Sequence, residues 1–148
     1  MLDKKRMPMK YIVFICSFIA LAFSCIAQTD CPVIDNPAKS PEYIGGIDSL
    51  QAYFDANALS SVSEQKLVFS GSILFTVHCN GFANIQNIST KGLKKRESKR
   101  MIKRVFEIAK NIPNKWLVAT HENDTPVDAG LEILYTVSQG KFKVSYKS

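Results

Sequence analysis

Histidine and paired metal ligands are scarce in this 148-residue sequence, which limits the chemistry it can carry. The two histidines are His78 and His121, and no spaced His or Cys pair of the kind that holds zinc accompanies either. His78 and Cys79 are neighbours in an expected strand, so their side chains would point to opposite faces. The sequence also lacks the G-x-S-x-G turn that presents a nucleophilic serine. We therefore expect no enzyme, metal or cofactor, and a small secreted hydrolase is the least favoured alternative.

A long apolar run is also missing, because a membrane-spanning helix needs ~20 consecutive apolar residues. The most apolar segment runs only from Ile12 to Phe23 and follows a cluster of Lys and Arg residues. A basic flank, a short apolar core and then small residues are typical of a secretory signal peptide. We expect residues 1–27 to be this signal and the protein to be exported to the periplasm or cell envelope. An uncleaved membrane anchor, a lipoprotein signal at Cys25, and a start at Met1, Met7 or Met9 stay open.

Positive charge is concentrated in two segments rather than spread along the chain. Without residues 1–27 the formal net charge falls from +6 to +3. The second basic segment is Lys91–Arg104, and no aromatic residues alternate with its cations as base stacking would require. We therefore expect no nucleic-acid partner, and interpret this run as a solvated helix face that attracts acidic surfaces only modestly.

Two cysteines remain after the expected signal, Cys31 and Cys79. An even number of cysteines in an oxidising compartment permits a disulfide. Cys79 also shares a strand face with Ile73, Phe75 and Val77, which favours a small buried thiol instead. Both alternatives stay open.

The pattern of apolar residues predicts one domain at 41–148, preceded by a linker at 28–40 that contains two prolines. We expect helices at about 48–58 and 94–111, and strands at 67–79, 82–90, 131–137 and 142–146. Asp48 or Ser49 should cap the first helix, and Asn80-Gly81 should form a tight hairpin turn with positive φ at both positions. Residues 60–64 and 121–128 should be loops. This order predicts a two-layer α+β fold, with two helices on one face of a small antiparallel sheet.

Four short motifs follow one another between residue 41 and the end of the sequence. They are Pro41-Glu42-Tyr43-Ile44-Gly45-Gly46, the run from Gly71 to Gly81, Ile112-Pro113-Asn114-Lys115-Trp116, and Thr125-Pro126-Val127. In this order and spacing the sequence resembles the C-terminal domain of the TonB family, in the form common in Bacteroidetes-type bacteria. The resemblance covers about residues 41–148 and implies a domain that binds protein partners and does not catalyse a reaction.

The resemblance also implies a mechanism. In the TonB family this domain binds an extended segment of an outer-membrane receptor, which adds itself to an exposed sheet edge during energised transport. The matching late strand implies an exposed edge made by Leu131, Glu132, Ile133, Leu134, Tyr135, Thr136 and Val137. A final strand from Phe142 to Tyr146 that folded back after Gly140 would cover this edge. The alternative is an exported structural or interaction protein on the same scaffold without a transport role. The protein partner, an outer-membrane receptor or another envelope protein, and the oligomeric state stay open.

Overall fold

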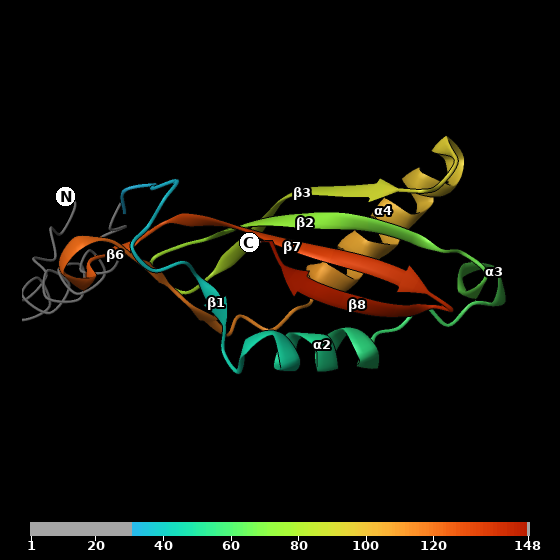
Figure 1. Cartoon of the computed structure of the whole chain (residues 1–148), viewed down its shortest axis with the longest axis horizontal. Coiled ribbons are helices and arrows are strands. Elements are labelled where there is room, and N and C mark those ends of the chain that lie inside the picture. Colours follow the sequence, from blue (N-terminus) through green and yellow to red (C-terminus); the bar gives the residue numbers. More distant parts are fainter. Residues whose placement is uncertain (1–30, 148) are drawn as a thin grey trace, which may run out of the picture. The chain divides into compact units, whose positions relative to one another are not determined.

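Four antiparallel strands form the main sheet, and two helices pack on it (Figure 1). The structure is a computed structural model that describes residues 31–147. The expected signal peptide, anchor and alternative start sites therefore lie outside the described residues. The strand order is β3-β2-β7-β8, with bounds Ala83–Lys91 for β3, Phe69–Val77 for β2, Ala129–Ser138 for β7 and Lys141–Tyr146 for β8.

Alternation of side chains explains why the sheet has one apolar face. In β2, Ile73 and Val77 are fully buried, whereas the intervening Leu74 is 37 % exposed. Strand β7 follows the same period, and its register with β2 places Ile133 directly opposite Ile73. Because successive side chains of a strand point to opposite faces, the buried residues of both strands line one side of the sheet.

Two helices cover that apolar side, and the predicted two-layer α+β fold is thereby confirmed. Helix α2 spans Gly46–Ala56 and packs along β8, while α4 spans Lys95–Ala109 and packs along β3. Each contributes a short apolar stripe, of which Phe54 in α2 and Met101 in α4 are fully buried. The opposite face of the sheet carries no helix among the described residues.

Tyr135 and Gly71 show how closely the core is packed. Gly71 lies opposite Tyr135 in the ladder, and a Cβ atom at Gly71 would lie 1.9 Å from the Ser89 carbonyl oxygen and 2.5 Å from the Tyr135 hydroxyl. Because Gly71 has no side chain, the Tyr135 phenol can pass over β2 and donate a 2.8 Å hydrogen bond to the Ser89 carbonyl in β3. Glycine in a strand interior often marks such a close approach.

Trp116 is buried between the segment after α4 and the sheet. Strand β1 (Glu42–Tyr43) pairs with β4 (Trp116–Leu117), and the Tyr43 and Trp116 rings meet edge to face with centroids 5.1 Å apart. Trp116 also contacts Phe75 of β2, with centroids 5.3 Å apart, and is only 5 % exposed. It therefore seals the end of the α4 segment against the sheet.

The expected linker is not free in its described part. Residues 31–40 lie against β5 (Ala119–Thr120) and the segment after β6 (Pro126–Val127), through bridges of Val33 to Asp128 and of Lys39 to Thr120. Lys39 and Thr120 exchange backbone hydrogen bonds of 3.0 and 3.1 Å. The linker prediction is wrong here because an irregular apolar pattern gives no indication of single bridges to distant backbone.

Four local predictions also need correction. Residues 60–64 contain a short helix, α3 (Val62–Gln65), whose first turn is capped by Ser61. Helix α2 begins earlier than expected, after Gly45, and neither Asp48 nor Ser49 caps it. The β2–β3 connection is longer than a two-residue turn: His78 bonds Phe82, and only Gly81 has positive φ. The loop at 121–128 contains β6 and a 3-10 turn, η1 (Glu122–Asp124).

Candidate partner-binding groove

The predicted partner-binding edge lies inside the sheet. Strand β7, which contains Leu131–Val137, pairs with β2 on one side and with β8 on the other. The tail does fold back after Gly140, so its residues occupy the backbone groups that a guest strand would need. The prediction that Leu131–Val137 form an open edge is therefore wrong, and the remaining candidates in the described residues are the outer margins of β8 and β3.

Helix α2 partly closes the margin at β8. The side-chain amide of Gln51 donates to the Phe142 carbonyl at 2.8 Å, and its oxygen accepts from the Val144 amide at 2.9 Å. One side chain thus reproduces the donor and acceptor pair of a neighbouring strand. The Tyr146 hydroxyl oxygen also accepts a 3.1 Å hydrogen bond from the backbone amide of Tyr43. Covering an edge with other parts of the chain prevents unwanted pairing.

Strand β3 keeps its outer margin open. It is the terminal strand of the order, and it pairs only with β2 among the described residues. Its register with β2 shifts where Ile85 and Asn87 lie opposite adjacent residues, which makes Gln86 the extra residue of a bulge. Bulges at sheet edges bend the strand and interrupt pairing locally. The margin is therefore an open but irregular row of backbone donors and acceptors.

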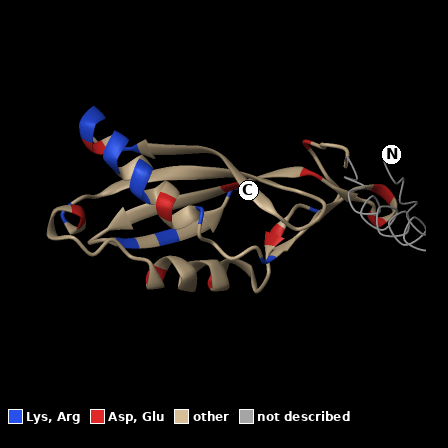
Figure 2. Ribbon diagram, turned by 180° about the vertical axis from the view of Figure 1, so that it is seen from behind, with Lys and Arg blue, Asp and Glu red and all other residues tan. Residues whose placement is uncertain are grey.

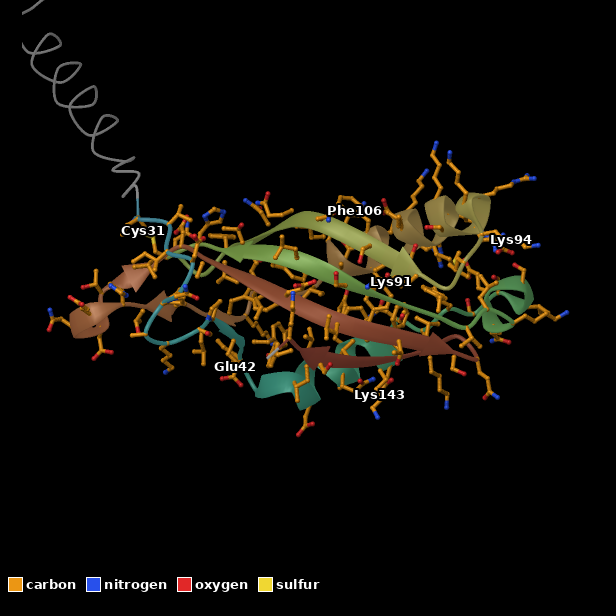
Figure 3. The ribbon with its side chains drawn as sticks, turned by 45° about the horizontal axis from the view of Figure 1, so that its top comes forward. Cys31, Glu42, Lys91, Lys94, Phe106 and Lys143 are labelled. Carbon is orange, nitrogen blue, oxygen red and sulfur yellow. A yellow bond between two sulfur atoms is a disulfide. The ribbon has the colours of Figure 1, made fainter. Side chains whose placement is uncertain are left out.

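Helix α4 turns a second apolar face toward this margin. The helix positions Ile102 and Phe106 lie one turn apart, beside the buried stripe that holds Met101 and Val105. Phe106 is 42 % exposed although it is a large apolar side chain. In Figure 3 it lies alongside β3, between the helix and the strand.

Two open depressions flank Phe106 and together form a groove between β3 and α4. One, of about 370 Å³, is lined by residues that include Ala109, Ile112 and Trp116. The other, of about 380 Å³, is lined by residues that include Ile88 and Ile102. Ile85 and Phe106 line both. We call this surface the β3–α4 groove.

Lysines stand along the rim of the β3–α4 groove. Lys99 and Lys103 line the depression next to Ile88, and Lys110 lines the one next to Trp116. In the described part of the chain neither Lys99 nor Lys103 has an ion-pair partner, whereas Lys110 contacts Glu107 at 2.5 Å. The hydrogen bond from Lys110 lowers the pKa of Glu107. In Figure 2 the ribbon of α4 is coloured for Lys and Arg at repeated positions along the helix.

The helix-free face of the sheet carries polar side chains together with the exposed apolar residues Leu74 and Leu134. A depression of about 620 Å³ there is lined mainly by serine and threonine hydroxyls and by Lys91, Lys143 and Lys147. Lys147 is engaged by Glu132 at 2.6 Å, and this contact lowers the pKa of Glu132. Figure 3 shows Lys91 and Lys143 on this side, away from Phe106. The backbone groups of paired strands lie within the sheet, so this face, unlike the β3 margin, offers no open row of donors and acceptors among the described residues.

His78 contacts a carboxylate through one ring nitrogen, as catalytic histidines often do. The His78 Nδ1 atom lies 2.6 Å from an Asp128 carboxylate oxygen, and the other oxygen accepts from the Cys79 amide at 2.8 Å. The Nε2 atom of His78 lies 3.0 Å from the Asn84 side-chain amide. No hydroxyl or thiol takes that position, so the arrangement lacks the nucleophile that a hydrolase dyad would serve.

The two cysteines that follow the expected signal are joined beside His78. Cys31 and Cys79 form a disulfide with Cα atoms 6.3 Å apart, which ties residues 31–40 to the end of β2. Their sulfur atoms and an Asp128 carboxylate oxygen lie close together. Bonded sulfurs are not available as thiolate ligands, so this cluster is structural in the oxidised protein. His121 lies apart from it, in the segment between β5 and η1.

Comparisons with known proteins add no relative: no family model, no curated protein and no solved structure matches this chain. The described residues contain no helix that is both long and apolar enough to cross a membrane. The candidate site therefore depends on the geometry of the chain itself.

Sequence reasoning missed the β3–α4 groove, although one signal was present. Val105 and Phe106 are adjacent apolar residues in a helix, and adjacent positions point about 100° apart. One apolar stripe against the sheet accounts for Val105 alone. When Val105 and Phe106 are assigned to one apolar face of the helix, the second apolar face, which carries Phe106, is overlooked.

Proposed function

We propose that this chain is an exported partner-binding module of the cell envelope, which binds an extended segment of another protein by strand addition. The observation that carries the proposal is the difference between the two margins of the sheet. Gln51 occupies the β8 margin, whereas the β3 margin keeps its backbone groups free among the described residues. Open strand edges bind extended peptides through main-chain hydrogen bonds, and adjoining pockets select their side chains.

The TonB-like motifs support a receptor as the partner. Tyr43 and Trp116, which belong to two of these motifs, pack against each other. The two-layer fold that the resemblance implies is also present. On this basis the partner is an outer-membrane receptor or another envelope protein, and binding is linked to energised transport.

One observation favours a second function. Strand β8 covers the strand that the resemblance assigns to receptor binding. A module that has lost this edge could serve as an interaction protein without a role in transport. The β3 margin would then bind a different envelope partner.

Site-specific photo-crosslinking tests strand addition. Benzoylphenylalanine replaces Gln86 in β3 or, as a matched control, Ser145 on the helix-free face of β8; both residues are exposed. We expect envelope adducts from position 86 alone, with the cross-link mapping to an extended segment of the partner. Hydrogen exchange of the recovered complex should show new protection in β3. Adducts from position 145 alone would contradict the proposal.

Deletion of the gene separates the two functions. If the cross-linked partner is a receptor and its substrate is no longer imported, the module has a transport role. If the cross-link at position 86 forms but receptor-dependent uptake is unchanged, the interaction protein is supported instead.

A further inference from the structure

We infer that the segment bound in the β3–α4 groove is acidic and carries apolar side chains at alternate positions. This inference rests on the proposed function, because it describes the guest that strand addition would place beside β3. It concerns the chemistry of the partner, which neither the fold nor the resemblance specifies.

The floor of the β3–α4 groove selects apolar residues with the spacing of a strand. A guest strand beside β3 turns every second side chain toward α4. These side chains would reach the two depressions on either side of Phe106. Residues i and i+2 of a strand are about 6.6 Å apart, so two alternate apolar residues can straddle one phenylalanine ring. A helical guest would lack this period.

The rim of the groove selects negative charge at both ends of the guest. Lys103 and Lys110 are seven positions apart and Lys99 and Lys110 eleven, or about 10 and 16 Å along the helix axis. At about 3.3 Å per strand residue these distances correspond to three to five residues. Because only alternate side chains turn toward α4, the matching guest has apolar residues at positions i and i+2 and acidic residues at i−2 and i+4. These acidic residues are about 20 Å apart, and the long lysine side chains at the two ends of the rim cover the remaining difference. Lysine stems can cover the apolar floor while their ammonium groups meet the carboxylates.

Charge also argues against a second copy of this chain as the occupant. Helix α4 carries six Lys or Arg and two Glu residues between Lys95 and Ala109. Pairing β3 with its own copy would bring two such helices together, and like charges across an interface disfavour association. The bulge at Gln86 further hinders regular self-pairing. For an acidic partner the charge obstacle is absent, because the cations of α4 then attract the partner instead of repelling it.

Three nine-residue peptides test the inference with the purified, disulfide-bonded protein. The first is Ser-Glu-Ser-Val-Thr-Val-Ser-Glu-Ser, in which both Glu and both Val side chains lie on the same face of an extended chain. The second replaces both Glu with Lys, and the third replaces the central Thr with Pro, which removes a backbone donor without changing charge. Binding is followed by amide chemical shifts in a ¹H–¹⁵N spectrum, which also locate the site. We expect the first peptide to shift β3 and α4 amides, and the other two to bind about tenfold more weakly or not at all.

The outcomes separate this inference from the proposed function. If the Lys peptide shifts the same amides with equal affinity, strand addition survives and the acidic specificity is wrong. If the Pro peptide binds as well as the first, the charge preference survives and strand addition is wrong. Shifts confined to the helix-free face, or β3 shifts that depend on protein concentration without peptide, contradict both and indicate another ligand or a second copy.

Variants place the charge and the apolar contact within the groove. Lys99→Glu with Lys103→Glu should lower affinity for the acidic peptide about tenfold and raise affinity for the Lys peptide. The matched control is Arg96→Glu with Arg100→Glu, since these residues also lie on α4 but do not line the depressions. Phe106→Ala should weaken binding, whereas Phe82→Ala, which removes an exposed phenylalanine outside the groove, should not. Equal effects of the paired variants would overturn the assignment.

Discussion

Gln51 and Val144 are joined by a hydrogen bond from the backbone amide of the strand to the side-chain oxygen of the helix, 2.9 Å long. The side-chain amide nitrogen of Gln51 in turn donates to the Phe142 carbonyl oxygen at 2.8 Å. This contact connects α2 to the last strand and occupies a margin that would otherwise be open. Because of this contact, backbone groups are occupied at one margin of the sheet, whereas among the described residues they stay open at the other.

Replacing Gln51 by Ala should expose the β8 margin. We expect faster hydrogen exchange at Val144 and a free energy of unfolding lower by about 1–3 kcal/mol, because two hydrogen bonds to the backbone are lost. Gln86→Ala provides the control, since Gln86 is exposed in the edge strand β3. Exchange measurements with urea unfolding provide both values. Unchanged exchange at Val144 would show that Gln51 does not protect this margin in solution.

Replacing Gly71 by Ala should be strongly destabilising. The new Cβ atom would meet the Ser89 carbonyl and the Tyr135 hydroxyl at distances that no side chain tolerates. We expect a loss of about 3 kcal/mol or failure to fold, as for severe overpacking. Gly130→Ala in β7 is the matched control, because nothing lies within 4 Å of its Cβ position. Similar urea midpoints for the two variants would contradict the packing described for Tyr135.

Reduction of the Cys31–Cys79 disulfide should loosen residues 31–40 first. The bond closes a loop with a sequence separation of 48, for which chain entropy gives about 4 kcal/mol of stabilisation. We expect a lower urea midpoint under reducing conditions, with faster exchange at Ile34 and Lys39. The double variant Cys31→Ser, Cys79→Ser should match the reduced protein and should not respond to reductant. A response of that variant would show that the effect has another source.

Tyr135 should make the protein sensitive to alkali. Burial raises the pKa of its phenol well above the ordinary value of 10.0. The unfolded chain therefore loses this proton at lower pH than the folded one, so stability is complete below pH 10 and declines as pH rises above it. Urea unfolding from pH 8 to 11, with tyrosinate absorbance, measures the decline.

Tyr135→Phe is the variant that isolates this effect. It should cost about 1 kcal/mol at neutral pH through the lost bond to Ser89. It should also unfold with a shallower dependence on alkaline pH. An equally steep decline in the variant would assign the sensitivity to other buried tyrosines, of which Tyr53 and Tyr146 also have raised pKa values through burial.

The sequence by itself determined the layers of this protein. The alternation around Ile73 predicts a strand with one buried face, and the spacing of Val105 and Ala109 predicts a helix that covers it. These patterns are local, because they follow from the two- and 3.6-residue periods of strand and helix.

Only the tertiary structure decided which strand margin is open. Periodicity reports which face a residue occupies, but it does not report which strands are neighbours. The sequence alone could not show that β8 pairs with β7 and so places β7 inside the sheet. The closing of the β8 margin likewise depends on Gln51, which is ninety-one positions from Phe142 in the sequence. The β3–α4 groove arises in the same way, because Phe106 acquires its role only when the helix lies beside a strand that has no outer neighbour.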